Sequence, residues 1–170
     1  MQNQQKSLIN TSLYLIPAII GSLLPLLTLP ILTRYLTLDD FGLYALAQAF
    51  AIFLNGVSNF GLTISYERNF FEANDRQKQS ELLYSSLLFL IISFIFFGIA
   101  TFFLRGWISI LITGDEKNGI LFFWSYCQIG VMSLKTLFLT YYKNNENARA
   151  NVWYTIDENL IGTVLTMVLI

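Results

Sequence analysis

The chain has 170 residues, of which 55% are hydrophobic and only 12% are charged, about half the charged fraction of an ordinary soluble domain. Its net charge of −1 provides no basic field for nucleic acid. The sequence contains no histidine and a single cysteine, Cys127, which excludes histidine-based catalysis, an internal disulfide and the usual zinc-ligand patterns. We expect an integral membrane protein without metal or cofactor.

Several segments are long enough to cross the hydrocarbon core of a bilayer, which is about 30 Å thick and needs about 20 apolar residues in a helix. The first is 7–33, a charge-free run that directly follows Lys6. It is too long for the apolar core of a cleaved signal peptide and lacks a clear small-residue cleavage site. We therefore expect a retained first membrane helix.

The first span carries all three prolines of the chain. Carbonyl groups that a proline frees in a membrane helix can be satisfied by neighbouring helices, by Ser/Thr side chains or by water, and bent helices are typical of transporters that alternate access. We expect a hinge formed by Pro17, Gly21 and Pro25, with a static kink that improves packing as the alternative. The hinge residues share one helical face with polar groups, and the whole face comprises Asn10, Tyr14, Pro17, Gly21, Pro25 and Thr28.

The second span, 41–66, carries amide and hydroxyl side chains along one helical face. They are Gln48, Asn55, Asn59 and Thr63. Intervals of seven, four and four residues return to the same side of a helix with 3.6 residues per turn. We interpret this stripe as the wall of a water-filled cavity, to which Asn10 of the first span also contributes. The alternative is that the side chains hydrogen-bond to neighbouring helices, each for about 1 kcal/mol or less.

Two further spans are 82–104 and 118–142, and a fifth hydrophobic segment starts at about 153 and is cut at 170. Together the segments predict an all-α integral membrane protein, a polytopic helix bundle that occupies residues 1–170 as one domain. Because the fifth segment is still apolar where the sequence stops and is too short to span, we expect an N-terminal part of a longer protein or a truncated product.

Lys135 is the one charged residue inside the 118–142 span. Ionisable residues within a span are rare and usually face the bundle interior or a transport path. Gln128 lies seven residues earlier, hence on the same face, and this favours a cavity-lining cation that could hold a phosphate or pyrophosphate group as a point charge. The alternative is a lysine that snorkels toward the cytoplasmic interface.

The basic residues of the connecting segments predict the orientation of the chain, because cytoplasmic loops carry an excess of Lys and Arg. With the N-terminus in the cytoplasm, six such residues lie inside and three outside, and we expect this orientation. Acidic groups at the span ends, such as Glu67 and Asp157, are interpreted as interfacial charges, with coupling-ion carboxylates as the alternative. The inside set is Lys6, Arg68, Arg76, Lys78, Lys143 and Arg149, and the outside set is Arg34, Arg105 and Lys117.

The segments "LPILTRYLTLDDFGLYALAQAF" (29–50) and "NFGLTISYERNF" (59–70) resemble the start of the polysaccharide-biosynthesis flippases, the Wzx-type O-antigen transporters. This family belongs to the multidrug, oligosaccharidyl-lipid and polysaccharide exporters. The resemblance covers residues 7–76 well, and the remainder is similar in hydropathy only.

The resemblance implies the N-terminal lobe of a MATE-like transporter, in which two pseudo-symmetric lobes surround a central cavity. It further implies that the protein moves an undecaprenyl-pyrophosphate-linked oligosaccharide across the bacterial cytoplasmic (inner) membrane for surface polysaccharide, O-antigen and lipopolysaccharide synthesis. The implied partners are the lipid-linked oligosaccharide, membrane lipids and other glycan-assembly membrane proteins, with no nucleic acid.

Three other functions compete with the flippase. The first is a small-molecule or drug exporter of the same fold, and the second is an inactive truncated membrane fragment. The third is a membrane-embedded sugar-transfer enzyme, which the sequence disfavours because the outside segments 34–40 and 105–117 are short and carry no nucleophile–base pair. We therefore expect no enzymatic activity.

Overall fold

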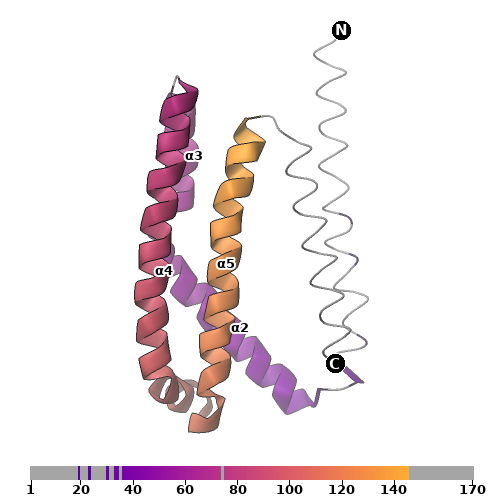
Figure 1. Ribbon diagram of the computed structural model, residues 1–170. Helices are drawn as coiled ribbons and strands as arrows, with labels where there is room; N and C mark the ends of the chain where they lie inside the picture. Colours follow the sequence, from indigo (N-terminus) through magenta and orange to yellow (C-terminus); the bar gives the residue numbers. More distant parts are fainter. Residues whose placement is uncertain are drawn as a thin grey trace. The chain divides into compact units, whose positions relative to one another are not determined.

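The structure is a computed structural model that describes residues 36–73 and 75–145, together with positions 19, 23, 30, 33 and 34. Residues 38–141 form one compact unit, and the fold described below is that of this unit. The five single positions are all helical, and they belong to the other unit, as do residues 36–37 and 142–145. Along the chain the elements are α2 (Leu38–Asn59), α3 (Leu62–Glu72), α4 (Arg76–Thr113), the 3-10 turn η1 (Glu116–Asn118) and α5 (Gly119–Asn144) (Figure 1).

Three helical segments of the described chain are long and apolar enough to cross a membrane: 38–59, 76–113 and 116–144. The described part of the chain contains helices and no strand, so the chain is an all-α membrane protein. The predicted spans 82–104 and 118–142 lie within α4 and α5. Most of the predicted first span and the whole segment after 153 lie outside the described residues.

The predicted span 41–66 is divided by a backbone turn into α2 and α3. Phe60 and Gly61 both adopt left-handed conformations, with φ of 50° and 70°. Glycine enters this region without strain, whereas a non-glycine residue seldom does. The Phe60 ring packs against Phe89 and Phe97 of α4, with centroid distances of 6.0 and 6.4 Å. Hydropathy alone gave no sign of the turn, because both residues are compatible with a continuous apolar run.

Helix α4 is longer than the predicted span at both ends. It has 38 residues, which correspond to about 57 Å at 1.5 Å per residue, against about 30 Å for the hydrocarbon core. Asp75 caps its start by accepting a hydrogen bond from the backbone N–H of Gln77. Gly114 ends it in a left-handed conformation and donates its N–H to the Ile110 carbonyl at 2.9 Å. Much of the expected outside connector 105–117 is therefore helical.

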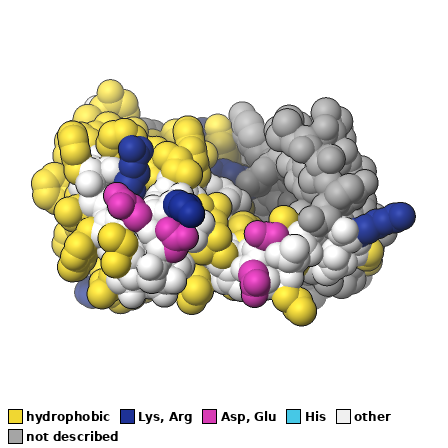
Figure 2. All heavy atoms as spheres, turned by 90° about the horizontal axis from the view of Figure 1, so that it is seen from below, with side chains coloured by type: hydrophobic (Ala, Val, Ile, Leu, Met, Phe, Trp, Pro, Cys, Tyr) yellow, Lys and Arg dark blue, Asp and Glu magenta, His cyan; other side chains and the backbone are white. Residues whose placement is uncertain are grey.

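Two small apolar clusters hold the helices together. Tyr66 and Phe70 of α3 pack with Leu90 of α4 and Leu137 of α5. At the other end Ala47 of α2 packs with Ile108 and Phe122. In contrast, many large hydrophobic side chains point outward, among them Phe103, which is 80% exposed, and Figure 2 shows such side chains around the described helices. This distribution suits a protein whose outer surface meets lipid rather than water.

Glycines allow α4 and α5 to approach closely at two levels. A β-carbon added to Gly119 would lie 2.7 Å from the Arg105 carbonyl oxygen, and one added to Gly130 would overlap the Phe94 ring. The Phe94 ring is itself stacked on Tyr126 of α5, with centroids 5.3 Å apart. Small residues at such positions are the usual means by which membrane helices come into contact.

We expect Gly119→Ala to lower the unfolding free energy by about 1 to 3 kcal/mol, because the new methyl group meets backbone atoms that cannot move independently. The matched control is Gly42→Ala in α2, where an added β-carbon has no neighbour within 4 Å. That variant should be neutral or more stable by up to about 1 kcal/mol, since alanine is the better helix former. Denaturant titration of the two purified variants in detergent measures both changes, and equal stabilities would contradict the close approach.

Candidate polar site between helices

The polar stripe predicted on the second span runs along α2 and continues past the turn into α3. Gln48, Asn55 and Asn59 lie on α2, and Thr63 lies in the first turn of α3. Asn59 bridges the turn, because its side-chain amide donates to the Thr63 hydroxyl at 3.1 Å. The second polar atom of the Asn59 side chain, Oδ1, is buried and accepts no hydrogen bond among the described residues.

Two amides of the stripe reach across to α5, and we call these two contacts the polar seam between α2 and α5. The Gln48 side-chain amide donates to Gln128 Oε1 at 3.3 Å, and the Asn55 amide donates to the Ser133 hydroxyl at 2.7 Å. The structure thus brings together Gln48 and Gln128, two residues that the sequence placed separately on the candidate cavity. The residue numbers of the two bonded pairs rise together, so α2 and α5 run in the same direction. This is expected when one membrane-crossing helix, α4, lies between them in the sequence.

Lys135 lies on α5, two residues after Ser133 and seven after Gln128. Seven residues are close to two helical turns, so Lys135 and Gln128 share a face of α5, as predicted. The side chain is partly buried, and it lies nine residues before the end of a 26-residue helix. A cation at such a position is costly in lipid and usually has a functional or interfacial reason to be retained.

Buried hydroxyl groups make a second set of contacts between helices, which the sequence analysis missed. Ser93 of α4 donates to the Ser58 carbonyl of α2 at 2.6 Å, and Tyr126 of α5 donates to the Phe94 carbonyl at 3.4 Å. The available signal was spacing, because the buried hydroxyl residues of α4 recur every seven or eight positions, which is close to two helical turns. These residues are Ser86, Ser93, Thr101 and Ser109.

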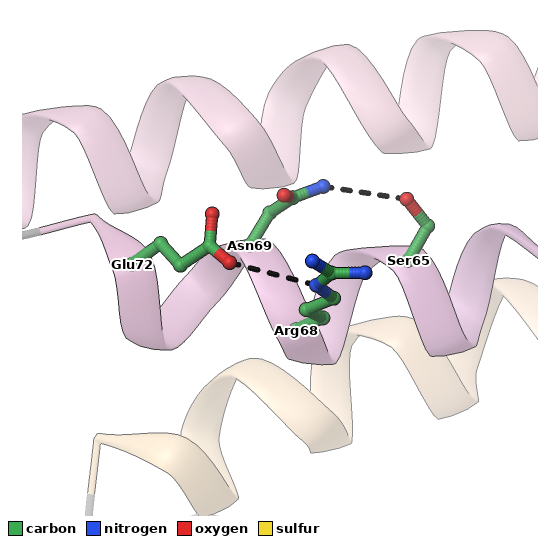
Figure 3. Close-up of polar contacts among 4 residues, drawn as sticks. All are labelled: Ser65, Arg68, Asn69 and Glu72. Atoms are coloured by element: carbon green, nitrogen blue, oxygen red, sulfur yellow. Dashed lines mark hydrogen bonds and ion pairs between the residues drawn. The ribbon is translucent and has the colours of Figure 1, made fainter.

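Within the described part of the chain, the charged side chains of α3 make only local contacts. Arg68 and Glu72 form an ion pair at 3.5 Å between side chains that are 81% and 65% exposed, and Asn69 donates to Ser65 at 3.3 Å (Figure 3). Exposed i,i+4 pairs of this kind contribute little to stability. This part of the candidate site is therefore a polar helix surface.

The remaining predicted site residues lie outside the described part of the chain. They are Asn10 of the cavity face and the hinge residues Pro17, Gly21 and Pro25. Within the described residues, no group of three or more Cys, Asp or Glu side chains is placed to hold a metal ion.

We expect Asn55→Ala and Ser133→Ala to be non-additive in the free energy of unfolding, with a coupling energy of about 0.6 kcal/mol, the average for hydrogen bonds between membrane helices. The same double-mutant cycle on Asn69 and Ser65 is the control, because that pair is exposed and lies within one helix. Additive losses at Asn55 and Ser133, measured by unfolding in mixed detergent, would show that the α2–α5 bond does not stabilise the bundle.

Comparison with known proteins gives one match. The family model described as polysaccharide biosynthesis protein matches residues 7–170. No significant match was found among curated proteins or among solved structures. The family match extends over almost the whole sequence, including the three membrane-capable helices and the polar seam between α2 and α5, and the chain therefore belongs to the polysaccharide biosynthesis protein family.

Proposed function

We propose that the protein takes part in moving an undecaprenyl-pyrophosphate-linked oligosaccharide across the bacterial cytoplasmic membrane. Membership of the polysaccharide biosynthesis family supports an export or flippase role in general terms. The undecaprenyl-pyrophosphate carrier and the cytoplasmic membrane go beyond what family membership supports, and they are part of the proposal. A lipid-linked oligosaccharide joins a polar head to a long apolar tail, and only a membrane-embedded pathway can accommodate both during transfer.

The observation that carries this proposal is the position of Lys135 within a membrane-capable helix, on the same face as Gln128. A single ammonium group within a span, on the face of α5 that also carries Gln128, offers a point charge for a pyrophosphate. The Gln48 and Gln128 amides, which bond to each other, are neutral donors and acceptors, which suit the hydroxyl groups of a sugar chain. The arrangement supports binding and release of an anionic lipid head during passage.

A transport role also suits the connections between the described helices. Helix α3 is joined to α4 through residues 73–75, and α4 to α5 through 114–118. Neither connection is long enough to build a catalytic constellation in this part of the chain, whereas membrane-embedded sugar-transfer enzymes need one. We therefore propose a non-enzymatic transporter whose partners are the lipid-linked substrate, membrane lipids and other glycan-assembly proteins.

We expect the N-terminus and the 73–75 connection to face the cytoplasm, with the 114–118 connection outside, because six of the nine counted basic residues then lie inside. Cysteines introduced at Asp75 and Asp115, both exposed, should react with an impermeant thiol reagent from opposite sides in a Cys127→Ser background. Labelling of intact cells at position 75 and not at 115 would reverse the orientation.

We expect Lys135→Ala to lower export of surface polysaccharide about tenfold at equal membrane abundance, the effect of losing one charge-assisted contact of about 1.5 kcal/mol. Lys135→Arg should retain part of the export, because the charge remains. The matched control is Lys143→Ala in the last turn of the same helix, where the side chain is exposed. Undiminished export by Lys135→Ala would instead favour a lysine that snorkels to the interface.

A further inference from the structure

A pocket of about 530 Å³ opens where α4, η1 and α5 meet. Three charged side chains line it, Arg105 of α4 and Glu116 and Lys117 of η1, so that two cations and one carboxylate face the same space. Figure 2 looks toward the end of the unit that carries η1, where positive and negative side chains lie close together among hydrophobic ones. We call this space the Arg105 pocket.

The backbone around the Arg105 pocket is held in place by close contacts. Gly106 leaves room for Glu116, whose carboxylate oxygen would lie 2.9 Å from a β-carbon at that position. The Asp115 carboxylate accepts the Lys117 backbone N–H at 3.0 Å, and the Ser109 hydroxyl donates to the Asp115 carbonyl. Among the described residues, the Arg105 and Lys117 side chains form no ion pair with these carboxylates. Their charges therefore remain available to a ligand.

An apolar groove of about 290 Å³ lies along α4 and α5, and it shares a lining residue with the pocket. Phe103 lines both spaces, and the Arg105 guanidinium lies over the Phe102 ring, 4.6 Å from its centroid. We call this the Phe102 groove, and it is lined by Phe94, Ile95, Gly98, Ile99, Phe102, Phe103, Phe123 and Cys127.

The length of the Phe102 groove matches one leaflet of a bilayer. Phe94 and Phe103 are nine residues apart on one helix, which is about 14 Å along its axis. Half of a hydrocarbon core of about 30 Å is about 15 Å. Arg105 follows directly after the charge-free part of α4, so the charged pocket lies at the level of lipid head groups when the groove lies among acyl chains.

We propose that the Arg105 pocket and the Phe102 groove bind a phospholipid whose head group carries both a phosphate and a primary amine, of the phosphatidylethanolamine class. Arg105 and Lys117 hold the phosphate, Glu116 accepts from the ammonium group, and one acyl chain lies along the groove. A head group that carries only negative charge would leave the Glu116 carboxylate next to a like charge. A quaternary amine has no N–H to donate to Glu116.

The test is native mass spectrometry of the purified protein released from nanodiscs that contain equal parts of phosphatidylethanolamine, phosphatidylglycerol and phosphatidylcholine. We expect selective retention of phosphatidylethanolamine. Arg105→Gln and Lys117→Gln should each lower its retention about fivefold, the effect of one cation near a lipid surface. Glu116→Gln should remove the preference over phosphatidylglycerol. Equal retention of the three lipids by the parent protein would overturn the proposal.

Two further variants locate the site. Arg68→Gln is the matched control, because Arg68 is an exposed cation on α3 that does not line the pocket, and it should leave lipid retention unchanged. Gly98→Leu should lower retention by filling the groove, since a β-carbon at Gly98 has its nearest neighbour, Tyr126, at 3.7 Å. Circular dichroism checks that this variant is folded. Loss of retention in Arg68→Gln equal to that in Arg105→Gln would also refute the assigned site.

Discussion

The absence of water in the hydrocarbon core is the constraint on which the structure depends, because every polar group there must find its partner within the protein. Helices satisfy their own backbone groups, so the described part of the chain is helical. Several side chains meet the same requirement: Asn55 bonds to Ser133 across α2 and α5, and Ser93 bonds to the Ser58 carbonyl across α4 and α2. Asn59 Oδ1 is an exception, because it is buried without a partner among the described residues. Apolar side chains meanwhile cover the outside, the reverse of their place in a soluble domain.

The same hydrogen bonds qualify the interpretation of the polar stripe. Gln48 and Asn55 were expected on the wall of a water-filled cavity, and in the structure both amides bond to α5. Each bond contributes about 1 kcal/mol or less, a free energy small enough for a substrate with hydroxyl groups to replace. A seam of such weak bonds holds the helices together and can also be opened. Lys135 is the one charged side chain within the 118–142 span, and the proposed transport function depends mainly on it.

The close approach of α4 and α5 accounts for both the Phe102 groove and the Arg105 pocket. Gly119 and Gly130 let the helices approach until backbone and ring atoms are in contact, and the aromatic residues between these levels leave the Phe102 groove on the outer surface. The same close approach at Gly106 and Gly119 brings Arg105 next to Glu116 and Lys117. Close packing of the helix pair thus forms the charged pocket where the apolar groove ends.

The sequence by itself determined the membrane class, the approximate spans within α4 and α5, and the shared face of Gln128 and Lys135. These depend on hydropathy and on the 3.6-residue period, which are local properties of the chain. Tertiary structure decided the turn at Phe60–Gly61, because the Phe60 ring is held by α4. It also decided the pairing of Gln48 with Gln128 and the pocket at Arg105. Such contacts depend on how helices cross, and residues 80 positions apart leave no local pattern that predicts their meeting.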